Sequence, residues 1–253
     1  MTLTVFCILL FAALLHASWN AIVKASGDKM YAAIGVSGSA ALIALVMLPF
    51  APQPALASAP YLLASCALQV VYTVLVAAIS VLFLGDRLSP LAWLGIGVIC
   101  LAILAMAFNG RASSRKGIVL ALINACFIAG YTLVDGTGVR LAGSALGYTL
   151  WTFFMNGFCL LCWAMVARRR EASRYLRQHW KKGILGGIGT MGSYGLALWA
   201  MTQAPLAVVA ALRETSILFG ALIAFIVLKE QLMPLRIVAA CGIAAGAILL
   251  RLA

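Results

Sequence analysis

The chain has 253 residues, of which 65% are apolar and only 9% charged, and its mean hydropathy is +1.10. A water-soluble protein of this size needs far more polar surface, so these values exclude a soluble globule and make lipid the main solvent. The formal net charge of +12 does not indicate nucleic-acid binding, because the basic residues lie at the ends of apolar runs, where membrane proteins place them.

Apolar runs of membrane-crossing length, about 20 residues each, follow one another along the chain. Glycine, proline and charged residues separate them, which predicts an all-α, polytopic membrane bundle of about nine helices. The predicted spans are 3–23, 32–51, 60–85, 90–108, 117–135, 146–167, 184–203, 207–228 and 234–252. The first run lacks the basic leader and cleavage site of a signal peptide, so we expect it to remain as the first helix.

The first predicted helix has a polar stripe. His16, Asn20 and Lys24 are spaced four residues apart and therefore share one helix face, with Trp19 beside them. Such a stripe should face the interior of the bundle, where His16 is either a proton-coupling group or an interhelical hydrogen-bond partner. Asn20 and Trp19 are candidate substrate contacts, and simple packing is the alternative for Trp19.

The two halves of the chain resemble each other. Residues 84–91 and 228–235 both have an acidic residue, then leucine two places on, then Pro-Leu, and Trp19 aligns with Tyr131. Two related halves are the usual construction of a secondary transporter. We place the repeats at residues 1–108 and 117–253.

The first repeat is shorter than the second. Tyr72 pairs with Tyr194 at an offset of 122, whereas Asp86 pairs with Glu230 at an offset of 144. The difference, about 22 residues, is close to one membrane crossing. The sequence therefore predicts a ten-helix parent, with two inverted five-helix repeats, that here lacks the end of helix 3 and the start of helix 4 near residues 72–81.

The segment Arg168–Lys182 has seven basic residues and only Glu171 as an acid. The positive-inside rule predicts that it is a cytoplasmic loop. If residues 60–85 form one span, the loop with Lys24 and Lys29 lies on the opposite side. If two helices once stood there, both basic loops share one side.

Two charged residues lie about two turns inside an apolar run. Each of Arg213 and Glu214 costs about 2.5–3.5 kcal/mol in a membrane unless it finds water or a partner, so they are the leading site candidates. Arg213 would hold an anionic group of the substrate, while Glu214 would bond Tyr194 or bind a proton. The alternative is a structural polar network between helices.

Further polar and aromatic side chains could line a substrate cavity or simply join helices. Those that we select as substrate contacts, besides the residues above, are Tyr72, Tyr131, Asn156, Tyr194 and Trp199. We expect Asp135, at the end of its predicted helix, to be a solvated cap.

The run Leu14–Ala21, then Lys24 and Ser26–Asp28, together with the paired acidic-x-Leu-x-Pro-Leu turns, resembles the EamA-type drug/metabolite transporter superfamily. The resemblance implies ten helices in two inverted repeats, a central cavity, and export of amino acids, metabolites or drugs without ATP. The chain has no Walker-type phosphate loop, in keeping with this. It also lacks the family's Tyr-Pro-x-x-Arg-like stretch between Tyr72 and Val81, so the contribution of helix 4 to the cavity is open.

The leading hypothesis is thus a secondary exporter of small molecules in the inner membrane, working by alternating access without a cofactor or metal. An inactive or accessory scaffold is an alternative because of the missing segment. A membrane-embedded enzyme is a further alternative, but the sequence lacks the catalytic groups that metal-dependent or acid–base hydrolysis needs. It has only two histidines, no HExxH motif and no paired acids within a span. The substrate, direction, coupling ion and oligomeric state stay open, and a monomer is among the options.

Overall fold

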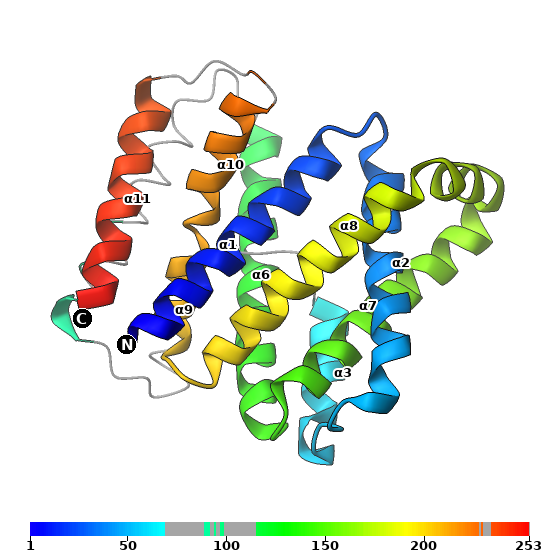
Figure 1. The fold of residues 1–253 in the computed structure, drawn as a ribbon, viewed down its shortest axis with the longest axis horizontal. Coiled ribbons are helices and arrows are strands. Elements are labelled where there is room, and N and C mark those ends of the chain that lie inside the picture. The colour runs from blue at the N-terminus through cyan, green and yellow to red at the C-terminus, as the bar shows by residue number, and fades with distance from the viewer. Residues whose placement is uncertain are drawn as a thin grey trace.

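The computed structural model describes residues 1–68, 89–91, 94, 97–98, 115–227, 229 and 234–252, and every regular element in these ranges is a helix (Figure 1). The α-helices are α1 (Leu3–Lys24), α2 (Lys29–Met47), α3 (Ala59–Leu68), α6 (Arg115–Leu141), α7 (Ala145–Ala167), α8 (Arg169–Met201), α9 (Leu206–Arg213), α10 (Ser216–Ile226) and α11 (Pro234–Leu252). Two short 3₁₀ helices, Leu48–Phe50 and Leu56–Ser58, lie between α2 and α3.

Local side-chain chemistry sets several helix ends. Asp28 caps α2 by accepting hydrogen bonds from the backbone nitrogens of Met30 at 2.9 Å and Tyr31 at 3.1 Å. The Ser144 hydroxyl caps α7 in the same way, at 3.0 Å from the Gly147 nitrogen. Helix α6 ends at Leu141, and Gly143 follows two residues later. Gly143 has φ +69°, a left-handed conformation that glycine adopts without strain and that is common after helix ends.

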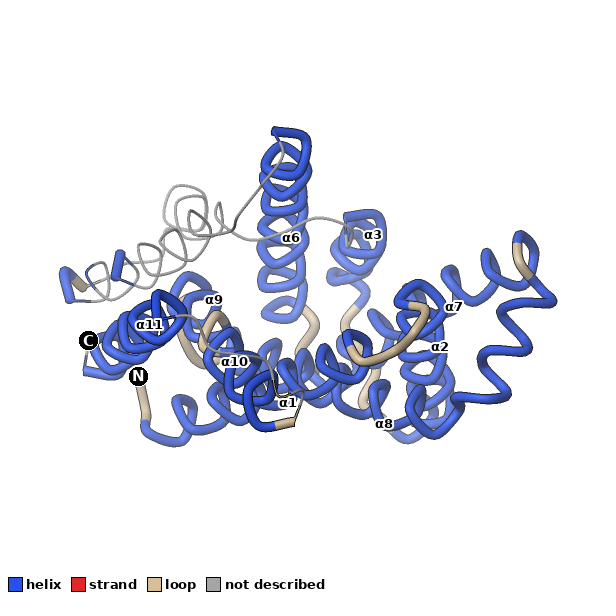
Figure 2. The backbone as a smooth tube through the Cα atoms, turned by 90° about the horizontal axis from the view of Figure 1, so that it is seen from above, coloured by secondary structure: helices blue, strands red, loops and turns tan. Residues whose placement is uncertain are grey.

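Helix α8 packs against α1, α2 and α7, and α1 packs in turn against α10 (Figure 1). Figure 2 shows α3 and α6 side by side, extending from one face of this layer. Close approach of α2 and α7 depends on Gly157, because a side chain there would fall on the carbonyl oxygen of Ser37. Small residues permit such contacts between membrane helices.

Among the described residues, five stretches are long and apolar enough to cross a membrane: Leu3–Lys24, Lys29–Phe50, Ala145–Val166, Arg169–Met201 and Leu206–Ile226. Several large apolar side chains on them point outward, such as Phe50, 87% exposed, and Val166, 88% exposed. Exposed apolar surface of this kind suits contact with lipid. The chain is therefore a multi-pass helical membrane protein.

The structure corrects one sequence prediction about helix continuity. The segment predicted as a loop, Arg168–Lys182, is helical from Arg169 on, and a kink at His179 (φ −118°, ψ 20°) separates it from the rest of α8. The predicted span 207–228 corresponds to the candidate span Leu206–Ile226, within which a turn at Glu214 and Thr215 separates α9 from α10. The charged segment was predicted as a loop because hydropathy detects apolar runs and does not detect the backbone hydrogen bonds of a polar helix.

The connection between α1 and α2 lies at the same end of the bundle as the start of α8. The hydroxyl of Tyr31, in the first turn of α2, donates a hydrogen bond to Glu171 Oε2 at 2.9 Å. The helix count, the shortened segment near 72–81 and the paired turns at Asp86 and Glu230 lie outside the described residues.

Candidate functional site

A cavity of about 270 Å³ lies where six helices meet. Its walls come from α1, α2, α6, α7, α8 and α9, so residues from both ends of the sequence contribute to it. It is lined by His16, Trp19, Ala33, Val36, Ser37, Tyr131, Phe153, Asn156, Gly157, Thr190, Tyr194 and Arg213. Cavities between the helices of a bundle are common ligand sites.

Tyr194 of α8 is the central side chain of this cavity. The guanidinium carbon of Arg213 lies 5.0 Å from the centre of the Tyr194 ring, within the range of a cation–π contact. The rings of Tyr131 and Phe153 pack edge-on against the same ring, with centres 6.0 and 6.2 Å away. Arg213 is only 8% exposed, so its charge is held inside the bundle against an aromatic surface.

The hydroxyl of Tyr194 leads to a buried carboxylate. It donates a hydrogen bond to Asp135 Oδ2 at 2.5 Å, and the hydroxyl of Tyr148 donates to Asp135 Oδ1 at 3.0 Å. Asp135 is 0% exposed, so the prediction of a solvated helix cap is wrong. The suggested bond from Glu214 to Tyr194 is also not formed, because the tyrosine hydroxyl is directed to Asp135. The cavity wall thus connects the arginine to a buried acid through one aromatic side chain.

The other predicted site residues lie in different surroundings. Asn20 lines a second depression of about 400 Å³ between α1 and α10, which His16 also borders, and its amide nitrogen donates to the His16 carbonyl at 2.9 Å. Trp199 is half-buried and packs against the main apolar core. Glu214 is half-buried at the turn after α9. Tyr72 lies outside the described residues.

Two polar side chains of the cavity, those of Asn156 and Trp19, differ in their hydrogen bonding. Asn156 donates from its amide nitrogen to the Thr152 carbonyl of its own helix at 3.0 Å, which fixes the direction of the side chain. The indole nitrogen of Trp19 is buried, and within the described part of the chain no acceptor bonds it. A buried donor of this kind can be satisfied by an acceptor group of a ligand. The His16 ring packs edge-on against Trp19, with centres 5.3 Å apart.

The turn between α9 and α10 lies directly beside Arg213. The backbone nitrogens of Glu214 and Thr215 bond the carbonyls three residues earlier, Ala211 and Leu212, each at 3.1 Å. These are 3₁₀ bonds, and a 3₁₀ stretch inside a longer helix often marks a hinge. The cation of the site is therefore carried by the last residue of a short helix.

Sequence reasoning missed Asp135 as a member of this network. A signal was present, since Tyr131 and Asp135 are four residues apart and so share a helix face. The chemistry of the assembled site is that of binding: a cation, aromatic walls and hydrogen-bonding groups surround a space suited to a small molecule. Among the described residues, no group of three or more His, Cys, Asp or Glu could hold a metal ion.

A bundle of apolar helices of membrane-crossing length, with buried charges at Arg213 and Asp135, defines a polytopic helical membrane protein. The family model for EamA-like transporters matches residues 115–252, more than half of the chain. The chain belongs to the EamA-like transporter family, which is consistent with the drug/metabolite transporter superfamily. It is thus a transporter by family rather than an enzyme. A comparison with curated proteins found no match.

Proposed function

We propose that the protein exports a small metabolite, amino acid or drug across the inner membrane by alternating access, with the six-helix cavity as the substrate site. The observation that carries the proposal is the Arg213 guanidinium, buried against Tyr194 in the wall of that cavity. A charged side chain buried among apolar helices marks a functional site by default, and the cavity beside Arg213 gives room for an anionic ligand.

The cavity favours a substrate with an anionic group next to an apolar part. The guanidinium of Arg213 would bind a carboxylate or a similar oxyanion through charge-assisted hydrogen bonds. The rings of Trp19, Tyr131 and Phe153 would pack against the apolar part. An amino acid or a small aromatic acid meets both requirements.

Alternating access requires a hinge at which one helix can change its orientation relative to the rest of the bundle. The 3₁₀ turn at Glu214 and Thr215 supplies one candidate, since it joins α9 to α10 immediately after the substrate-binding arginine. Glu214 or His16 would serve as the proton-coupling group. The basic start of α8, Arg168–Lys182, would lie on the cytoplasmic side.

The test is counterflow in liposomes reconstituted with the purified chain. Labelled amino acids and aromatic acids are offered outside, with the same compounds unlabelled inside. We expect saturable uptake of at least one compound. Arg213→Gln should raise its half-saturation concentration at least about tenfold, because a lost charge-assisted bond costs about 1.5 kcal/mol or more. The matched variant Arg174→Gln, which changes an exposed arginine of α8, should transport like wild type.

Coupling is tested in the same vesicles with an imposed pH gradient. Glu214→Gln should abolish the acceleration by the gradient and leave counterflow in place. Equal efflux by wild type and Glu214→Gln under all gradients would reject Glu214 as the coupling group. Absence of counterflow for every compound, in a chain that is folded and correctly inserted, would reject the carrier proposal.

A further inference from the structure

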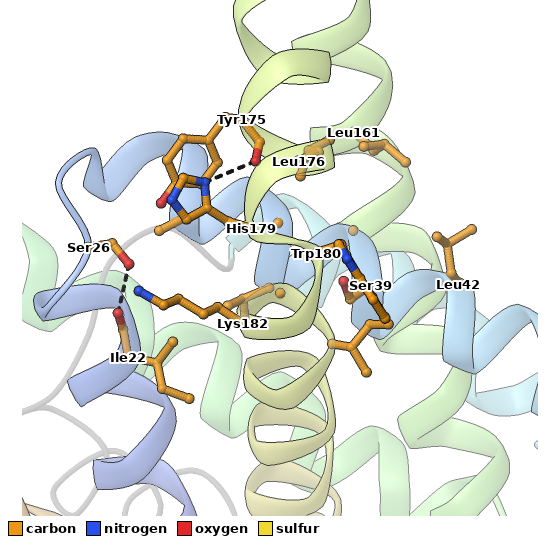
Figure 3. A pocket seen from close by; sticks show the side chains of 16 residues that line it. Ile22, Ser26, Ser39, Leu42, Leu161, Tyr175, Leu176, His179, Trp180 and Lys182 are labelled. Carbon is orange, nitrogen blue, oxygen red and sulfur yellow. Dashed lines mark hydrogen bonds between the residues drawn. The ribbon is translucent and has the colours of Figure 1, made fainter.

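A separate cavity, of about 220 Å³, lies between the end of α1, the middle of α2, α7 and the kink of α8 (Figure 3). Most of its wall is apolar, with Ile22, Val36, Leu42, Leu161, Leu176 and Ile184 contributing. Polar groups gather where α8 enters it, namely His179 and Lys182. The cavity is therefore amphipathic, with an oily interior and a basic margin.

The cavity lies at the boundary between the charged and apolar parts of α8. Lys182 is the last basic residue of the segment, and the sequence from Gly183 on is apolar. Trp180, at this boundary, is 55% exposed, as tryptophans at a membrane interface commonly are, and Leu42 of α2 is 58% exposed. A boundary between charged and apolar residues of this kind is typical of the headgroup level of a bilayer, where a lipid headgroup and an acyl chain are both within reach.

The charge around the cavity is unbalanced. The segment Arg168–Lys182 has one carboxylate, Glu171, which already accepts a hydrogen bond from Tyr31 at 2.9 Å and lies 3.6 Å from Arg168 Nη1. Within the described ranges, Lys182 has no carboxylate in ion-pair distance. Figure 3 shows its side chain extending along the cavity toward Ser26. The cation is thus available to an anion from outside the chain.

His179 lies at the same margin, and its ring has a fixed orientation. Its ring stacks on Tyr175 with centres 4.2 Å apart, and its Nδ1 donates to the Tyr175 carbonyl at 3.2 Å. Because a carbonyl can only accept, Nδ1 carries the proton in this bond, and Nε2 of the neutral ring is then an acceptor. Of the two side chains, Lys182 is therefore the one that can donate to an anion. The kink of α8 at His179 lies at this margin of the cavity.

We propose that this cavity binds an anionic phospholipid of the surrounding membrane, with the phosphate at Lys182 and part of one acyl chain along the apolar wall. Basic pockets between membrane helices at the charged boundary suit such headgroups. The acyl chain would pack against Leu42, Leu161 and Ile184, and burial of this apolar surface would stabilise the bound lipid. This lipid site is separate from the proposed transport function and does not depend on it.

The test is native mass spectrometry of the purified full chain in detergent, with palmitoyl-oleoyl phosphatidylglycerol or phosphatidylcholine added at equal concentration. Wild type should retain phosphatidylglycerol about fivefold more strongly, the effect of one basic side chain near an anionic group. Lys182→Gln should remove that preference, whereas Arg170→Gln, at an exposed arginine outside the cavity, should retain it.

A second pair of variants tests the apolar wall. Leu42→Trp fills the cavity and should weaken binding of both lipids, while Leu45→Trp, on an exposed position of the same helix outside the cavity, should not. Equal retention of the two lipids by wild type would overturn the proposal. So would an equal loss of preference in Lys182→Gln and Arg170→Gln, because that result indicates diffuse attraction to a basic surface.

Discussion

Replacing Tyr194 with phenylalanine removes one hydroxyl from the buried network and leaves the aromatic ring in place. The lost bond, 2.5 Å from Tyr194 Oη to Asp135 Oδ2, ends on a carboxylate that is 0% exposed. Bonds between membrane helices average about 0.6 kcal/mol and reach about 1.7, and bonds to charged groups lie at the upper end. Asp135 keeps the Tyr148 bond at 3.0 Å, so we expect a loss of about 1.5 kcal/mol.

A loss of that size shifts the unfolding equilibrium by about tenfold, which reversible unfolding in mixed detergent micelles can measure. The control is Tyr175→Phe, which removes a hydroxyl that makes no hydrogen bond with the described residues and should change the unfolding free energy little. A change below about 0.3 kcal/mol for Tyr194→Phe, or equal losses for the two variants, would refute a stabilising role for this bond. Since the ring stays beneath Arg213, substrate affinity should fall less in Tyr194→Phe than in Tyr194→Leu.

Three further variants test the packing and the helix ends. Gly157→Ala should lower the free energy of unfolding by about 1–3 kcal/mol in the same micelle assay, because the new methyl group falls on the Ser37 carbonyl oxygen. Its control, Gly220→Ala in α10, meets nothing within 4 Å and should be neutral or stabilising, as alanine favours helix. Asp28→Ala removes the cap of α2 and should cost about 1 kcal/mol, whereas Asp28→Asn should restore most of it. Arg140→Gln removes bonds from Nε to the Met201 carbonyl (2.8 Å) and from Nη2 to the Ala204 carbonyl (3.1 Å), and should lower the melting temperature.

For each of these three variants, one outcome of the stability measurement would contradict the stated physical reason. Equal stability of Gly157→Ala and wild type would mean that α2 and α7 separate without cost. An Asn at position 28 that is no better than Ala would show that the cap contributes nothing. Unchanged melting of Arg140→Gln would show that the carbonyls at the end of α8 find other donors.

Hydropathy was sufficient to locate the membrane helices of the described residues. The predicted spans 3–23 and 146–167 correspond to α1 and α7 within a residue or two, because an apolar run in lipid must satisfy its backbone internally. Hydropathy failed at residues 168–182, since this helical segment is rich in charged residues and its mean hydropathy is therefore low. In that helix Ala172 is buried while Arg170 and Arg174 are exposed.

The candidate site was only partly accessible to sequence reasoning. Arg213 was recognisable because a charge within an apolar run is costly, and the polar stripe on the first helix identified His16. Asp135 was misjudged because its position near the end of a predicted span suggested solvent. Its burial depends on Tyr148 and Tyr194, and these come from two other helices whose packing no local pattern specifies.

The short length of α9 has a mechanical consequence. Arg213 is its terminal residue, and the tight turn that follows separates its orientation from that of α10. A small rotation of this eight-residue cylinder would slide the guanidinium across the face of Tyr194, while the phenol stays tied to Asp135 on another helix. Position of the cation and shape of the cavity would then change together, in a single movement.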